Sequence, residues 1–206
     1  MENNLTLDEN HIYHLNGVVI PGYSEIASAM GITNFSGISE RVMEAARNFG
    51  SAGHYATRLW DEKRLDESTL SAPLIPCLEE YKNFLIDFKV EIIPGYIEKP
   101  ICSTIYRYGV TPDRVCVING ELSILELKFV ESMSKATELQ TAAQKLAAEE
   151  FYKIKIKRRY GLQIPQKGKA KIYPYTNKSD EQTWIAALSL YNWRVKNGNK
   201  NQWKRM

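Results

Sequence analysis

The stretch that decides the fold runs from residue 111 to residue 130 and reads TPDRVCVINGELSILELKFV. Residues 115–118 are apolar and mostly β-branched, and residues 122–129 form a second, largely apolar run. Asn119-Gly120 between them is a strong signal for a two-residue hairpin turn. The sequence therefore predicts a β-hairpin, with Asp113 at the start of its first strand.

The second predicted strand carries two charged side chains, Glu126 and Lys128. Because side chains alternate along a strand, these two share a face with Leu122 and Ile124. The opposite face holds Leu125, Leu127 and Phe129. Both faces look covered, as in a central strand. Charges there cost several kcal/mol of folding free energy unless they are paired or bound to a metal.

Asp113 and Glu126 are expected to converge near a strand end. Two carboxylates so placed make an oxygen site of the kind that Mg²⁺ or Mn²⁺ takes, with other positions left to water and a substrate phosphate. Lys128 would then hold or deprotonate the attacking water. A hairpin with a purely structural Glu126–Lys128 pair fits the spacing equally well, so the rest of the chain has to decide.

Pro112-Asp113 and Glu126-Leu127-Lys128 match the signature of the PD-(D/E)XK nuclease superfamily, which this chain resembles. Within the superfamily it is most similar to RecB-type and lambda-exonuclease-like (YqaJ-like) nucleases. The resemblance implies a restriction-endonuclease-like α/β core, a mixed sheet of about four to five strands flanked by helices. It also implies that the carbonyl of Leu127 is a metal ligand beside Asp113 and Glu126.

The resemblance implies metal-binding roles for two upstream residues, His54 and Glu98. Gly50 and His54 have the spacing of the glycine-x-x-x-histidine helix motif of RecB-type nucleases, whose histidine helps bind metal. An imidazole ligand would favour Mn²⁺ without excluding Mg²⁺. Glu98 is a weaker metal candidate, since related nucleases often place a glutamate one strand before Pro-Asp. Without the resemblance, His54 reads as a packed residue and Glu98 as a solvent-facing one.

A long helix from Ala136 to about Arg158 is predicted by its Ala, Leu, Glu, Gln and Lys content. Gln140 and Gln144 lie on one face of it, in line with an apolar stripe. RecB-type nucleases carry glutamine-x-x-x-tyrosine on the corresponding helix. Gln140 matches as a site residue that positions the site or contacts phosphate, whereas Gln144 departs from the pattern. The alternative is that both amides are ordinary helix-surface residues.

The other elements are scaffold. We expect a hairpin over residues 11–20, a helix from Ser24 to Met30, helices over residues 39–64 and 73–89, strands over residues 90–97, 101–108 and 167–175, and a last helix capped by Asp180. Gly50 and Gly53 should interrupt the second helix. His11 and His14 should have surface or packing roles, and Trp184 and Trp193 should belong to the core.

Composition favours one domain. The chain has 206 residues, 44% hydrophobic and 25% charged, which suffices for one sizeable core over residues 1–206. We divide it into an N-terminal hairpin and helix (1–35), a nuclease core (36–195) and a frayed basic tail (196–206). No apolar run approaches 18 residues and no signal peptide is apparent, so we expect a cytoplasmic protein of a bacterium or a phage-infected host.

Charge is unevenly distributed. Residues 1–144 hold 12 Lys+Arg against 20 Asp+Glu, whereas residues 145–206 hold 15 against 4. A basic C-terminal third could face a polyanion or be a merely solvated surface. The weak candidates for DNA contact form one row: Lys153, Lys155, Lys157, Arg158 and Arg159.

The three cysteines include no CxxC, so neither a disulfide framework nor an iron–sulfur cluster is expected.

The resulting prediction is a DNA nuclease that uses one or two Mg²⁺ or Mn²⁺ ions. Resemblance to the lambda-exonuclease-like group implies an exonuclease on linear DNA, linked to recombination or repair in a phage or bacterium. It also suggests a single-strand annealing recombinase as a partner and allows for an oligomer, since some relatives form rings. The alternatives are an endonuclease of the same superfamily, a catalytically inactive DNA-binding module and a scaffold protein.

Overall fold

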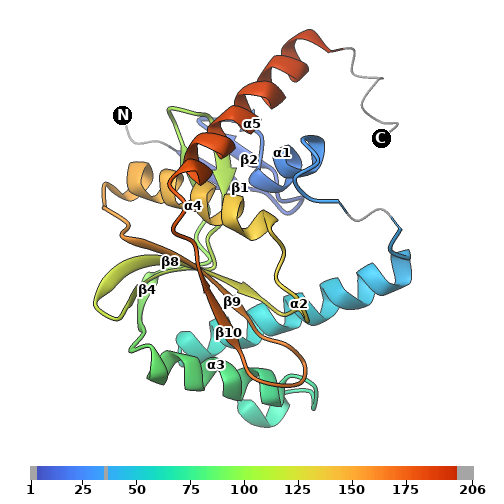
Figure 1. Cartoon of the computed structure of the whole chain (residues 1–206), viewed down its shortest axis with the longest axis vertical. Coiled ribbons are helices and arrows are strands. Elements are labelled where there is room, and N and C mark those ends of the chain that lie inside the picture. Colours follow the sequence, from blue (N-terminus) through green and yellow to red (C-terminus); the bar gives the residue numbers. More distant parts are fainter. Residues whose placement is uncertain (1–3, 35–36, 199–206) are drawn as a thin grey trace.

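The computed structural model describes residues 4–34 and 37–198 and is built around one mixed sheet (Figure 1). The sheet has five strands in the order β10-β9-β8-β7-β4. Their bounds are Glu91–Ile97 for β4, Arg114–Ile118 for β7, Glu121–Lys128 for β8, Arg158–Gln163 for β9 and Lys171–Pro174 for β10. β8 is antiparallel to β7 and parallel to β9. The predicted fold class, a mixed sheet of four to five strands flanked by helices, is confirmed.

The β7–β8 hairpin forms as the sequence predicts. Asn119 and Gly120 both have positive φ, 48° and 79°, which is the backbone of a type I′ turn. Ile118 pairs with Glu121 beside the turn, and the pairing continues to Arg114 and Leu125. Because β9 lies on the other side of β8, β8 is an interior strand, as the covered faces of residues 122–129 indicated.

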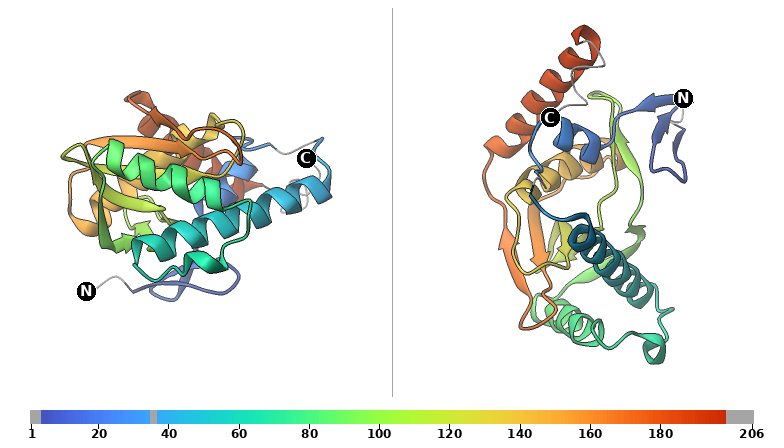
Figure 2. Two further views of the ribbon diagram at one scale, coloured as in Figure 1. Left: turned by 90° about the horizontal axis from the view of Figure 1, so that it is seen from below. Right: turned by 90° about the vertical axis from the view of Figure 1, so that its right-hand side faces the viewer.

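Helices cover both faces of the sheet. α4 (Ala136–Tyr152) packs on one face, and α2 (Glu40–Asp61) and α3 (Ile75–Asp87) lie on the other (Figures 1 and 2). Ile124 belongs to the core cluster under α4, whereas Leu125 and Leu127 belong to the cluster under α3. The alternation of side chains along β8 therefore divides the core into two layers.

α5 (Ser179–Asn197) packs against α4 and against α1 (Tyr23–Ala29). Trp184 is fully buried there, with its ring 5.0 Å from that of Tyr23. Trp193, which we expected in the core, is 62% exposed near the end of the helix. The predicted frayed tail begins in α5 at residues 196–197, and its residues 199–206 lie outside the described part of the chain.

The N-terminal hairpin is confirmed and is larger than predicted. β2 (Tyr13–Leu15) and β3 (Val18–Ile20) pair as expected, and β1 (Leu5–Leu7) adds a third strand. α1 begins at Tyr23 with Gly22 as its N-cap residue, so Ser24 is not the cap. Gly22 bridges to Gly109, which joins this small sheet to the core.

Residues 101–108 are not one strand of the main sheet. They contribute β5 (Ile101–Ser103) and, after a turn, the start of β6 (Tyr108–Val110), which form a separate two-stranded sheet. The turn is held from α4, because Glu150 Oε1 accepts hydrogen bonds from the backbone N–H groups of Thr104, at 2.7 Å, and Ile105, at 3.1 Å. A short 3-10 helix, η1 (Glu67–Thr69), links α2 to α3.

Three helix predictions need correction. α2 is continuous through Gly50 and Gly53. α4 ends at Tyr152, because Lys153 takes the left-handed conformation at φ 56° and residues 153–157 continue as an extended connection to β9. Asp180 is not a cap: it lies inside α5, buried, with Oδ2 2.7 Å from Arg159 Nη2.

In the described residues, none of the helices combines the length and the apolar character needed to cross a membrane.

Candidate active site

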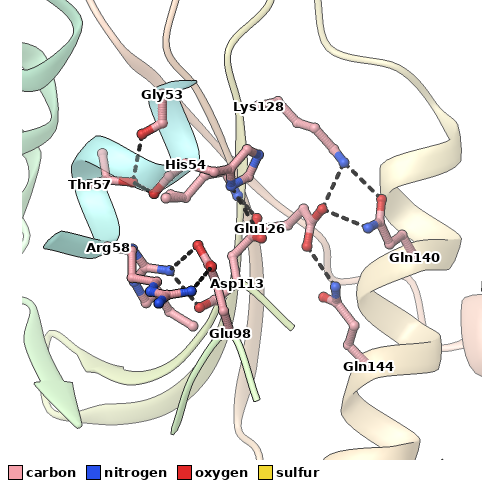
Figure 3. Close-up of polar contacts among 12 residues, drawn as sticks. Gly53, His54, Thr57, Arg58, Glu98, Asp113, Glu126, Lys128, Gln140 and Gln144 are labelled. Atoms are coloured by element: carbon pink, nitrogen blue, oxygen red, sulfur yellow. Dashed lines mark hydrogen bonds and ion pairs between the residues drawn. The ribbon is translucent and has the colours of Figure 1, made fainter. Parts of the chain in front are cut away.

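The predicted site residues come together where β8 ends and β7 begins (Figure 3). Asp113 lies just before β7, and Glu126 and Lys128 lie in the last part of β8. α2 brings His54 to this edge from one side of the sheet, and α4 brings Gln140 from the other. Segments far apart in the sequence therefore meet at the open end of the β7–β8 hairpin. The Asn119-Gly120 turn lies at the other end.

His54, Glu98 and Asp113 form the first half of the site. One ligand atom from each lies within 4.8 Å of the others, and His54 Nδ1 is 3.4 Å from Asp113 Oδ1. Glu98 is brought there by its backbone, because it adopts φ 46° and its N–H donates to the carbonyl of Asp113 at 3.0 Å. The weak sequence candidate Glu98 thus joins the two stronger ones.

This donor set suits a divalent cation. Two carboxylate oxygens suit Mg²⁺ or Mn²⁺, and an imidazole nitrogen beside them favours Mn²⁺ over Mg²⁺. Asp113 Oδ2 already accepts a hydrogen bond from the N–H of Leu127 at 2.7 Å, which orients the carboxylate and leaves Oδ1 toward His54. The role expected for the Leu127 carbonyl stays a prediction.

Glu126 forms the second half of the site with polar side chains from β8 and α4. Its Oε1 accepts from Lys128 Nζ at 2.7 Å and from Gln140 Nε2 at 2.6 Å. Gln140 Oε1 in turn accepts from Lys128 Nζ at 2.9 Å, so these three side chains form a closed triangle (Figure 3). Gln140 is therefore a neighbour of the site rather than a helix-surface residue.

Gln144 completes this network, although it departs from the family pattern. It is fully buried, and its Nε2 donates to Glu126 Oε2 at 2.6 Å. Both oxygens of Glu126 are thus engaged by α4. The spacing of four residues between Gln140 and Gln144 placed both amides on one face, but no local pattern showed that this face meets a carboxylate.

The environment sets the protonation of the three titratable groups. Burial, and after it the charge of Glu126, raises the pKa of Asp113 well above its ordinary value. Burial lowers the pKa of His54, which favours the neutral imidazole that a metal requires. Burial also disfavours charge on Lys128, but the carboxylates of Glu126 and Asp113 outweigh it and its pKa is raised. Lys128 is therefore an ammonium, suited to orienting water rather than to removing a proton from it.

A buried arginine behind the site was not predicted from the sequence. Arg114 is 1% exposed, and its Nε lies 2.7 Å from Asp61 Oδ2, while Tyr81 donates to the same oxygen at 2.8 Å. Arg114 Nη1 donates to the carbonyl of Asp113 at 2.7 Å and lies 3.5 Å from Glu98 Oε1. This arginine links both carboxylate residues, Asp113 and Glu98, to Asp61 of α2. An arginine in an apolar strand was a signal that the sequence offered.

The position of His54 depends on a close approach between α2 and Phe129, the residue that directly follows β8. The ring of Phe129 lies 5.3 Å from that of His54, and a Cβ placed on Gly53 would lie 2.5 Å from the Phe129 ring. A Cβ placed on Gly50, the glycine of the predicted motif, would have no neighbouring atom within 4 Å. The packing requirement thus falls on Gly53.

A cleft of about 720 Å³ leads to the carboxylates. Its lining comes from the N-terminal sheet, the start of α1, α2 and the loops that carry Glu98 and Asp113. Arg58, one turn after His54, lines it too and holds Glu98 through a contact of 3.5 Å. His11, expected to have only a surface or packing role, also lines the cleft.

The predicted basic row lies away from this cleft. Arg158 pairs with Ser123 in the β8–β9 register, and Lys128 lies five positions further along β8. Arg158 therefore lies roughly 16 Å from Lys128 along the strand direction, at about 3.3 Å per residue. Arg159 is buried and bound to Asp180, so it is unsuited to DNA contact. Lys153, Lys155, Lys157 and Arg158 are exposed.

No protein-family model and no curated protein matches this chain. Among solved structures it is similar to one described as the crystal structure of SSO0001, with 16% sequence identity and a TM-score of 0.35. The match covers 84% of this chain and 85% of that one.

Proposed function

We propose that this chain is a metal-dependent DNA nuclease of the PD-(D/E)XK type that hydrolyses phosphodiester bonds. The observation that carries the proposal is the meeting of His54, Glu98 and Asp113 in the lining of one cleft, with the Glu126–Lys128 pair close behind them. Buried charges on strands are costly, and a bound cation with an anionic substrate would offset that cost.

The residues divide the chemistry between them. His54, Glu98 and Asp113 would hold Mg²⁺ or Mn²⁺, with Glu126 reaching the same ion or a second one. When bound, such an ion activates water and neutralises charge on the phosphate. Lys128, held as an ammonium by Glu126 and Gln140, would orient the attacking water. Gln140 and Gln144 each donate to one oxygen of the Glu126 carboxylate, so Glu126 would exchange one of these bonds for a bond to the ion.

Within this class we favour an exonuclease on linear DNA that serves recombination or repair in the cytoplasm of a bacterium or an infected host. A single-strand annealing recombinase would then be its partner. This assignment rests on the resemblance of the motifs to the RecB-type and lambda-exonuclease-like group. An endonuclease of the same superfamily and an inactive DNA-binding module are the alternatives.

Cleavage of end-labelled linear and closed circular DNA tests the proposal, with Mg²⁺, Mn²⁺ or a chelator. Lys128→Ala should lower the cleavage rate about 100-fold or more, the usual effect of removing a group that stabilises charge in the transition state. Lys135→Ala is the matched control, because the Lys135 side chain is 95% exposed and forms a surface ion pair with the nearby Glu138. It should cleave like the wild type.

The substrates separate the alternatives. Cleavage of linear DNA alone supports an exonuclease, and nicking or linearisation of the circle supports an endonuclease. Binding without cleavage by the wild type would support the inactive module. Equal metal-dependent cleavage by the wild type and Lys128→Ala would overturn the mechanism.

A further inference from the structure

Gln144 is the exception on the buried face of α4. The other buried residues of this helix are alanines and threonines, whose small side chains let the helix lie close to the sheet. Gln144 is fully buried among them, whereas Gln140, one turn earlier, is half-buried and lines the cleft. The spacing of four residues puts both amides on one face of the helix. A buried amide costs folding free energy unless its polar atoms find partners.

The amide of Gln144 has a partner at one end only. Its Nε2 donates to Glu126 Oε2 at 2.6 Å. Its Oε1 is buried and has no hydrogen-bond partner among the described residues. Gln140, by contrast, uses both ends of its amide, donating to Glu126 and accepting from Lys128. The carbonyl end of Gln144 therefore costs folding free energy, and what this side chain contributes is its bond to Glu126.

Glu126 stands apart from the residues that could bind a cation without rearrangement. Those residues are His54, Glu98 and Asp113, whose ligand atoms lie within 4.8 Å of one another, and in the described part of the chain Glu126 is not one of the group. Figure 3 shows the Glu126 carboxylate directed toward Gln140 and Gln144. To reach an ion held by the other three, this carboxylate has to turn and exchange a hydrogen bond.

The two oxygens of Glu126 are held with unequal strength. Oε1 accepts two hydrogen bonds, and one of them comes from the ammonium group of Lys128, which adds the attraction of an ion pair. Oε2 accepts its one side-chain bond from an uncharged amide. Oε2 is therefore the oxygen that a cation would take at the smaller cost, and Gln144 is the donor that would lose its partner.

We propose that Gln144 is a positioning residue that restrains Glu126 and so sets the metal concentration at which Glu126 engages the cation. The proposal rests on the proposed metal-dependent hydrolysis, because it concerns the ion of that reaction. Once Glu126 has turned to the ion, both ends of the buried Gln144 amide lack a partner, and this cost weakens metal binding. Because the RecB-type pattern has tyrosine here, the restraint belongs to this chain and not to the resemblance.

Isothermal titration with Mn²⁺ in the absence of DNA tests the proposal. Gln144→Met keeps the length and volume of the side chain but has no donor. Glu126 then starts without a bond from Gln144, so Mn²⁺ should bind about tenfold more tightly than to the wild type, or better. Gln144→Asn is a second variant, whose amide is one methylene group too short to reach Glu126. It should tighten Mn²⁺ binding similarly.

Gln163→Met is the matched control. Gln163 is also a buried glutamine, 4% exposed, but its amide donates to the carbonyl of Glu131 and accepts from Tyr173. Its loss should leave Mn²⁺ affinity unchanged. Equal or weaker Mn²⁺ binding by both Gln144 variants would overturn the proposal, because the bond would then support the metal site instead of restraining it. An equal gain in Gln163→Met would overturn it too.

The side-chain amide signals of ¹⁵N-labelled protein give a readout that does not depend on affinity. The Gln144 signal is the one that is absent from Gln144→Met. Saturation with Mg²⁺, which is diamagnetic, should shift this signal upfield because its hydrogen bond to Glu126 is lost, and should leave the Gln163 signal in place. A Gln144 signal that stays in place would show that Glu126 keeps this bond, contrary to the proposal.

The two proposals fail separately. If loss of the Gln144 amide tightens Mn²⁺ binding but the wild type cleaves no DNA, the restraint stands and the nuclease proposal falls. If the wild type cleaves DNA and both Gln144 variants bind Mn²⁺ as it does, the restraint falls and the nuclease proposal stands. Absence of Mn²⁺ binding in all the proteins would overturn both.

Discussion

Asp113 has an environment that favours a bound cation. It is buried beside a second carboxylate, Glu126, and its pKa lies well above the ordinary value of 3.8. For a carboxyl group with a raised folded-state pKa, the stabilising contribution is complete below the unfolded pKa and is lost as pH rises through the folded pKa. The metal-free protein is therefore destabilised by this group as pH rises above about 3.8, and a divalent cation would remove the cost.

Asp113→Asn should accordingly stabilise the metal-free protein at neutral pH. The amide keeps an oxygen to accept from Leu127 N–H and carries no charge toward Glu126. We expect the melting temperature to rise by about 2–4 °C for each kcal/mol gained in a chain of this size. If Mn²⁺ binds at this site, it should raise the melting temperature of the wild type, and that rise should disappear in the variant.

Differential scanning calorimetry with and without Mn²⁺ measures both effects. Asp87→Asn, at an exposed position of α3, controls for the loss of a surface carboxylate and should keep the Mn²⁺ response. A lower melting temperature for Asp113→Asn without metal, or a full Mn²⁺ response in it, would show that Asp113 is a structural acid.

At the scale of elements, the contact between α2 and Phe129, which directly follows β8, decides where His54 lies. Gly53 is the point of closest approach, because a Cβ there would meet the ring of Phe129 at 2.5 Å. A contact below 3 Å forces the ring or the helix to move, and overpacking of this kind costs about 1–3 kcal/mol. Gly50 faces open space, so a methyl group there would only favour the helix.

Gly53→Ala should therefore lower both the stability and the metal response, whereas Gly50→Ala should raise stability by about 0.5–1 kcal/mol. The two substitutions add the same methyl group to the same helix. Urea unfolding gives the free energies, and Mn²⁺ titration monitored by melting temperature gives the metal response. If Gly53→Ala responds to Mn²⁺ like Gly50→Ala, the glycine does not position His54.

Sequence predicts an element well where its signals are local. The β7–β8 hairpin follows from alternation and from Asn119-Gly120, all within one short stretch. The end of α4 does not, because Lys153 adopts the left-handed conformation without the Gly or Asn that usually marks it. The split of residues 101–108 depends on Glu150, which lies more than 40 residues further along the chain.

The same distinction holds for the site. Asp113, Glu126 and Lys128 stand in a motif, and His54, Glu98 and Gln140 could be placed by their resemblance to related motifs. The bond from Gln144 to Glu126 and the Arg114–Asp61 pair join segments 18 and 53 positions apart, and only the folded chain brings them together. Prediction from sequence thus reached the side chains that carry the proposed chemistry, and Gln140 among those that hold them, but gave neither the bond from Gln144 to Glu126 nor the Arg114–Asp61 pair.

At the scale of the whole molecule, the cleft exists because the N-terminal sheet is fastened to the core. Tyr13 makes that junction: its ring lies against Gly109, where a Cβ would be 2.2 Å away, and its hydroxyl bonds to Thr111. Gly22 lies against the same ring and bridges to Gly109. No side chain larger than hydrogen fits at Gly109 without moving Tyr13 and, with it, one wall of the cleft.

Gly109→Ala should therefore loosen the N-terminal sheet and weaken DNA binding together. We expect a loss of about 1–3 kcal/mol in the free energy of unfolding and a parallel loss of affinity for DNA. Gly95→Ala is the control, because a Cβ on Gly95 meets nothing within 4 Å. A double-mutant cycle with Tyr13→Ala isolates the contact: the Gly109→Ala cost should largely vanish where the ring is absent. If the costs of the two substitutions are additive, the Tyr13–Gly109 contact does not hold this wall of the cleft in place.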